Sequence, residues 1–216
     1  MMQPVTAPRS LKEKQRQERE ELILQAAEEV LVEKGFYETS VDEIAARVGI
    51  AKGTVYLHFP GKEDLVIAIL QRNAREVVEL VEATVAVPRS NREKLEAVLG
   101  VVYNRFFDLH KGQLMQLPYE FMNSPELRRV FVEKKGCLKQ EWGRLEVLIA
   151  SILEDGKAAG EFDTSMPTSV MLSAFFSLMS PRSFERITTD SQMPVDEFAK
   201  HLARFYFKGI AKVQGE

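Results

Sequence analysis

The sequence has few of the features that mark an enzyme or a metalloprotein. Its 216 residues include one cysteine, Cys137, so no internal disulfide can form. The three histidines, at positions 58, 110 and 201, lack the spacing of a metal site, and no glycine-rich loop of the kind that cradles phosphates occurs. We therefore expect a protein that is not an enzyme and that has no metal or other cofactor.

Long apolar runs are also missing. The longest uncharged stretch, residues 164–181, contains five serines, two threonines and two prolines, and is too polar to span a bilayer. The first twenty residues become polar and charged where a secretory signal needs an apolar run. We predict no membrane association and a cytoplasmic location, which the single cysteine fits.

Helical periodicity dominates the rest of the sequence. Apolar residues recur every three or four positions, and no run alternates long enough for a strand. We predict an all-α protein of about nine helices, with a flexible tail over residues 1–16, a small three-helix unit over 17–66 and a larger helical unit over 67–216. A long helix from Lys62 to about Val85 joins the two units.

Charge is unevenly distributed in the small unit. The net charge of −3 gives no support for a nucleic-acid partner, yet the nineteen positions from Ile44 to Lys62 hold no carboxylate and include Arg47 and Lys52. Three short helices, the last two joined by a glycine-containing turn, describe helix-turn-helix geometry. A recognition helix must be short, exposed on one face and free of acids, and residues 52–58 meet these conditions. We predict that this helix enters the major groove of DNA.

The candidate DNA contacts lie on this helix or at neighbouring helix starts. Groups at the start of the helix can contact base edges, and hydroxyls and amines at its periphery can contact phosphates. The purely structural alternatives are that Thr39 and Ser40 only cap a helix, that Lys62 is a solvated lysine and that His58 fills a turn. The full set is Thr39, Ser40, Arg47, Lys52, Gly53, Thr54, Tyr56, His58 and Lys62.

The segment TSVDEIAARVGIAKGTVYLHFPGKEDL, residues 39–65, closely resembles the DNA-binding domain of the TetR family of transcriptional regulators. The resemblance covers about residues 18–66. It implies a homodimeric, ligand-responsive repressor whose two recognition helices read a palindromic operator on double-stranded DNA; activation is a further possibility within the same fold. The family roles fall on Thr39 and Lys62 for phosphate, on residues 52–54 for base edges, and on Tyr56 and His58 for the DNA backbone.

The larger unit is expected to bind a small-molecule effector. Aromatic and methionine residues are dense between positions 95 and 159, and they suit an apolar ligand with few polar anchors. Ordinary core packing is the alternative for each of them. Another alternative is that this half docks a partner protein instead of a small molecule. The candidate ligand contacts are Tyr103, Phe106, Phe107, His110, Met115, Tyr119, Met122, Trp142 and Phe175.

The last two helices are predicted to form the homodimer interface. Ser169, Ser173 and Ser177 form a small-residue strip that would let another helix approach closely. The final helix carries an apolar stripe wider than a surface helix needs, which would complete an isologous four-helix contact. Burial inside one chain is the alternative. The stripe comprises Val195, Phe198, Ala199, Leu202, Phe205, Tyr206, Phe207 and Ile210.

Overall fold

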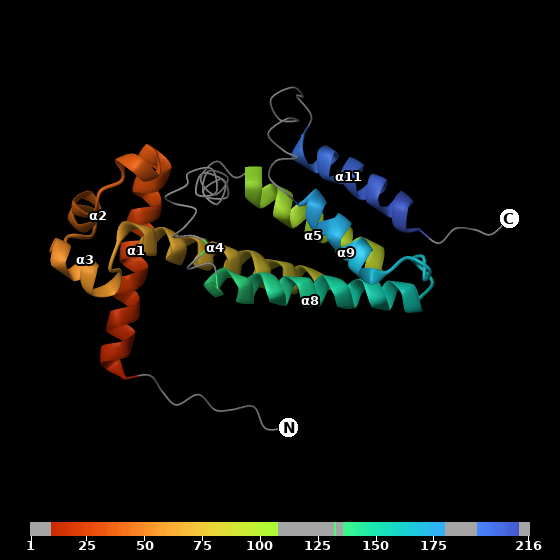
Figure 1. The fold of residues 1–216 in the computed structure, drawn as a ribbon, viewed down its shortest axis with the longest axis horizontal. Helices are drawn as coiled ribbons and strands as arrows, with labels where there is room; N and C mark the ends of the chain where they lie inside the picture. The colour runs from red at the N-terminus through yellow and green to blue at the C-terminus, as the bar shows by residue number, and fades with distance from the viewer. Residues whose placement is uncertain (1–9, 108–131, 133–135, 180–193, 212–216) are drawn as a thin grey trace. The chain divides into compact units, whose positions relative to one another are not determined.

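The computed structural model describes residues 10–107, 132, 136–179 and 194–211, which form eight helices and no strand (Figure 1). The all-α prediction is confirmed. The chain divides into two compact units, residues 1–69 and 70–216. The helices are α1 (Leu11–Glu38), α2 (Val41–Val48), α3 (Lys52–His58), α4 (Lys62–Val85), α5 (Asn91–Phe107), α8 (Gly136–Ala158), α9 (Thr168–Leu178) and α11 (Val195–Ile210).

The first helix begins earlier than the sequence analysis proposed. We predicted a flexible tail through residue 16, but α1 starts at Leu11 behind a complete capping box. The Glu13 amide donates to Ser10 Oγ at 3.3 Å, and the Ser10 amide donates to Glu13 Oε2 at 2.8 Å. Near its other end, Gly35 has φ 75° and ψ 174°, a conformation that suits glycine and breaks the helix.

In the first unit, α2 packs against both α1 and α3. Ser40 caps α2 by accepting from the Glu43 amide at 3.2 Å, as predicted. The Glu43 carboxylate accepts from Lys34 at 2.8 Å. Gly49, with φ 75°, ends α2 in the left-handed conformation and turns the chain toward α3. The fully buried residues that join these helices are Ile23, Ala27, Val30, Ile44 and Val55.

The second unit is built on one apolar core shared by α4, α5, α8, α9 and α11. The hydroxyls of two buried tyrosines donate hydrogen bonds to backbone carbonyl oxygens. Tyr103 donates to Leu178 at 2.6 Å, and Tyr206 donates to Met171 at 2.8 Å. Burial raises the pKa of both phenols. These bonds tie α5 and α11 to α9 at fixed positions.

The turn between α8 and α9 closes the second unit. Phe162 is buried and stacks on Phe207 of α11 with 6.3 Å between ring centres. The preceding residue, Glu161, accepts from the backbone amides of Asn91 and Arg92 at 3.2 and 3.0 Å. A carboxylate from a distant part of the chain thus caps the start of α5, where the helix dipole favours negative charge.

Candidate nucleic-acid interface

The helix α3 presents one face to solvent and anchors the opposite face through Val55. Val55 is fully buried, whereas Lys52, Gly53 and Tyr56 are exposed. The most exposed side chain on this helix is Leu57, at 81%. Leu57 is not among the predicted DNA contacts, because the prediction relied on polar and charged side chains at the start and periphery of the helix.

Two basic side chains of the carboxylate-free segment, Arg47 and Lys52, form ion pairs with acidic residues from elsewhere in the same unit. Lys52 donates to Asp42 of α2 at 2.6 Å, and this hydrogen bond raises the pKa of Lys52. Arg47 donates to Glu33 of α1 at 2.9 Å and to Glu43 at 3.1 Å. The hydrogen bond to Glu33 is the main cause of a raised pKa at Arg47. Neighbouring helices therefore supply the negative charge that the segment itself lacks.

Lys62 holds the chain where α1 ends. Its ammonium has three donors, and they meet the carbonyl oxygens of Phe36, Tyr37 and Thr39 at 2.7, 3.3 and 3.1 Å. Burial lowers the pKa of Lys62, and the Glu63 carboxylate opposes that shift. All the hydrogen-bonding capacity of this side chain is used inside the protein, so a phosphate contact would have to displace one of these bonds.

Thr39 and Ser40 both act as helix-end groups. The Thr39 hydroxyl donates to the Gly35 carbonyl at 2.7 Å, and Thr39 is only 4% exposed. Ser40 is exposed while its Oγ accepts from the α2 amide described above. Of the two, Ser40 is the one whose surface remains open to a phosphate.

His58 fastens the end of α3 to α1. Its side chain is 8% exposed, and Nδ1 lies 3.1 Å from Oε1 of Glu20. Arg16 donates to the same carboxylate oxygen at 3.1 Å. Burial alone would raise the pKa of Glu20, but the hydrogen bonds from His58 and Arg16 outweigh it and the pKa is lowered. His58 therefore positions the recognition helix, and its ring is not presented to solvent.

The arrangement of α2 and α3 agrees with a comparison to protein families. Residues 23–69 match the family described as bacterial regulatory proteins, tetR family. The chain thus carries the DNA-binding domain of the TetR family of regulators. The matched residues run from the middle of α1 into α4 and include both helices of the helix-turn-helix.

Relatives of this chain include two named regulators. It is 34% identical over 127 residues to the HTH-type transcriptional activator FasR of Mycolicibacterium smegmatis, an alignment that covers 56% of each chain. The chain thus aligns with only about half of that relative's length. It is 26% identical to the fatty acid metabolism regulator protein of Bacillus subtilis over 87% of this chain and 93% of that one.

A solved structure shares the fold over most of the chain. The transcriptional regulator FadR from Bacillus subtilis, crystallised in complex with stearoyl-CoA, superposes with a TM-score of 0.70 at 22% identity. The likeness covers 88% of this chain and 98% of that one. The likeness in fold therefore extends beyond the DNA-binding unit.

The three predicted effector contacts whose side chains the structure describes do not line a common cavity. Tyr103 and Phe175 are fully buried core residues, and Tyr103 packs edge to face against Phe198. Trp142 is 44% exposed on α8. For these three residues core packing or surface exposure is what the structure shows. The other six candidates lie outside the described side chains: Phe106, Phe107, His110, Met115, Tyr119 and Met122.

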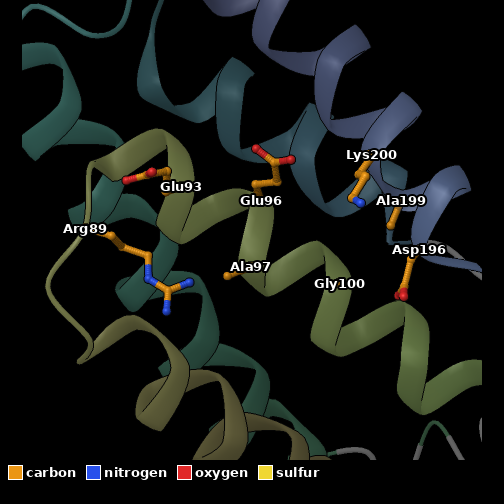
Figure 2. A pocket seen from close by; sticks show the side chains of 8 residues that line it. All are labelled: Arg89, Glu93, Glu96, Ala97, Gly100, Asp196, Ala199 and Lys200. Carbon is orange, nitrogen blue, oxygen red and sulfur yellow. The ribbon is translucent and has the colours of Figure 1, made fainter.

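In the part of the chain that the structure describes, a cavity of about 400 Å³ lies between α5 and α11 (Figure 2). Figure 2 shows acids and bases around it: Glu96 of α5 and Lys200 of α11 line it together, with Arg89 at one end. None of the predicted effector contacts lines it. Side chains of both charge signs dominate, so this cavity does not fit the apolar effector that the sequence suggested.

Most of the predicted interface stripe on the last helix packs inside the chain. Of this stripe, Leu202 is half-buried, Phe205 is 74% exposed, and the side chain of Val195 is not described. On α9 the serine strip at 169, 173 and 177 is exposed together with Val170. The stripe residues buried against α5 and α9 are Phe198, Ala199, Tyr206, Phe207 and Ile210.

Neither a membrane-spanning helix nor a metal-binding cluster occurs among the described residues. No helix among them combines the length and the apolar composition needed to cross a membrane. Across the same residues, no three or more His, Cys, Asp or Glu side chains gather closely enough to hold a metal ion.

Proposed function

We propose that this chain is a ligand-responsive transcriptional repressor of the TetR family that binds a palindromic operator as a homodimer. Residues 17–66 would bind DNA, and residues 67–216 would bind the effector and form the dimer. The observation that carries the proposal is the acid-free exposed face of α3, where Lys52, Tyr56 and Leu57 are exposed opposite the buried Val55 and Thr54 is half-buried. Side chains near the start of such a helix read base edges in the major groove.

A dimer is supported by what the last helices leave uncovered. The strip of Ser169, Ser173 and Ser177 would let a helix of the partner approach closely, and Phe205 offers an exposed aromatic anchor. Two recognition helices set about 34 Å apart would then reach successive major grooves. The expected symmetry of the operator follows from the symmetry of the dimer.

We further propose that the effector is a long-chain acyl thioester. The Bacillus subtilis relative is named as a fatty acid metabolism regulator, and the FadR structure of similar fold holds stearoyl-CoA. A largely apolar effector was also the prediction from the aromatic and methionine content. An effector with higher affinity for a conformation that spreads the recognition helices apart lowers operator affinity, and DNA must weaken effector binding by the same factor.

Activation is a second candidate outcome, because the Mycolicibacterium smegmatis relative is named an activator. The DNA-binding surface is the same in both cases. What differs is whether the effector lowers or raises operator affinity and where the operator lies relative to the promoter. The sign of the coupling therefore separates the two.

Fluorescence anisotropy of the purified protein on a labelled duplex from its own upstream region tests these proposals. We expect specific binding, a 2:1 protein-to-duplex stoichiometry, and release by stearoyl-CoA but not by free coenzyme A. Tighter binding with stearoyl-CoA would indicate an activator. Unchanged affinity with stearoyl-CoA would remove this effector class and favour a docked partner protein, and absence of any sequence-specific binding would overturn the regulator itself.

A further inference from the structure

The first turns of α1 form an ordered helix that buries nothing. Every residue from 11 to 19 is exposed, and the capping box at Ser10 and Glu13 starts the helix. Ordering a helical turn costs conformational entropy that burial normally offsets. These residues make no such contribution to the core. A helix of this kind suits contact with something outside the chain.

One face of this segment is cationic and borders the recognition helix. Lys12, Arg16 and Arg19 follow one another at spacings of four and three, so they share a face of the helix. Together with Gln15 they line a cleft of about 310 Å³ whose other wall is Leu57 and His58 of α3. The cleft therefore joins the exposed end of the recognition helix to a basic surface.

Two of these cations are available for an external anion. Among the described residues, no carboxylate forms an ion pair with Lys12 or Arg19. Arg16 differs, because it donates to Glu20, which also holds His58. The basic residues inside the helix-turn-helix, Arg47 and Lys52, already form ion pairs with carboxylates of the same chain. The uncompensated positive charge next to α3 thus comes from α1.

We propose that residues 11–19 form a phosphate-binding arm, in which Lys12 and Arg19 contact the DNA backbone that borders the groove entered by α3. The inference rests on the proposed DNA-binding function and adds a backbone contact outside the helix-turn-helix. Its ligand is the phosphodiester chain, which carries no sequence information. The arm would strengthen binding to every duplex and would place α3 against the groove.

The salt dependence of DNA binding tests the arm. Each phosphate contact that is lost reduces the slope of log affinity against log salt concentration by about 0.9. We expect Lys12→Gln and Arg19→Gln each to reduce the slope by about that amount, and the double variant to reduce it by about twice as much. Affinity should fall equally for the upstream duplex and for a scrambled duplex, so their ratio stays the same.

Lys14→Gln is the matched control, since Lys14 lies two residues from Lys12 and points to the other side of the same helix. It removes the same charge at the same end of the chain and should leave the slope unchanged. Circular dichroism should show all variants folded, because each side chain is exposed. If the double variant keeps the wild-type slope, or if Lys14→Gln reduces the slope equally, the proposed phosphate-binding role of residues 11–19 is ruled out. Specific binding by the wild type would then still support the proposed function. If the wild type binds no duplex, the proposed function fails as well.

Discussion

The ammonium of Lys62 on α4 donates to the carbonyl oxygen of Phe36 at 2.7 Å and lies 4.3 Å from the centre of the Phe36 ring. Phe36 directly follows the break in α1 at Gly35, where the helix leaves carbonyl oxygens without intrahelical donors. Lys62 therefore closes the end of α1 and at the same time fixes the start of α4. This is a structural role for a residue that the family resemblance assigns to phosphate.

Replacing Lys62 with methionine should lower the free energy of unfolding by about 2 kcal/mol, because three carbonyl oxygens lose a charged donor. Urea titration followed by circular dichroism measures the loss. Lys52→Met is the comparison, since its ion pair with Asp42 is exposed and such pairs contribute little. Equal stabilities of the two variants would contradict the closing role of Lys62.

Leu57 should contribute to base preference without contributing to stability. An apolar side chain that is 81% exposed on a recognition helix can contact the methyl group of thymine. We expect Leu57→Ser to weaken operator binding roughly fivefold, a loss of about 1 kcal/mol, and to leave the melting temperature unchanged. Replacing operator thymines one at a time with deoxyuridine should weaken the wild type at one position and leave the variant indifferent there. Full sensitivity of the variant at every position would exclude this contact.

Local signals in the sequence predicted most helix boundaries. Ser40 as a cap and the start of α4 at Lys62 are both readable within one turn, and both agree with the structure. The capping box at Ser10 and Glu13 carries an equally local signal, and it was missed because the basic residues around it were interpreted as a tail.

The partners of charged residues could not be predicted in the same way. Arg47 pairs with Glu33 fourteen positions away, and Lys62 bonds to Phe36 twenty-six positions away. Such contacts depend on how helices pack, which periodicity alone does not specify. For the same reason, the sequence did not reveal the contact made by His58. Its ring lies against Glu20 of α1, whereas the adjacent Leu57 faces solvent.

Two glycines of α8 should respond oppositely to alanine. A Cβ on Gly156 would lie 2.2 Å from the ring of buried Phe162, whereas a Cβ on Gly143 would meet nothing within 4 Å. Gly156→Ala should destabilise the protein by about 1–3 kcal/mol through overpacking. Gly143→Ala should stabilise it by about 0.5–1 kcal/mol through helix propensity. Thermal unfolding compares the two, and a stabilised Gly156→Ala would show that the Phe162 ring moves freely.

Stability should depend on the ionisation of Glu161 in acid. Burial raises the pKa of this carboxyl, but the amides of Arg92 and Asn91 outweigh it, and the pKa is lowered from its usual 4.5. A lowered folded-state pKa contributes stability that is present above the unfolded-state pKa and is lost as pH falls through the folded-state value. Glu161→Gln should cost about 1–2 kcal/mol at neutral pH, and the difference from wild type should shrink below pH 4.5.

The exposed carboxyl of Glu146 on α8 provides the control for this loss of stability at acidic pH. Glu146→Gln should track the wild type at every pH, because it removes a charge without removing a helix cap. Chemical denaturation at a series of pH values gives both curves. A constant offset between Glu161→Gln and wild type from neutral to acidic pH would show that the Glu161 contacts do not depend on its charge.

Asn73 is a buried polar residue on an otherwise apolar face of α4. It is 3% exposed and precedes Val77 and Val81 at spacings of four, and within the described part of the chain neither atom of its amide has a hydrogen-bond partner. An unpaired buried amide costs about 1–3 kcal/mol. Asn73→Leu should therefore raise the free energy of unfolding by about 1–2 kcal/mol and the melting temperature by about 2–4 °C per kcal/mol. Asn73→Asp, which buries a charge at the same place, should lower both. A lower melting temperature for Asn73→Leu would mean that the amide is paired in solution, by water or by a bound molecule, and that α4 depends on that pairing.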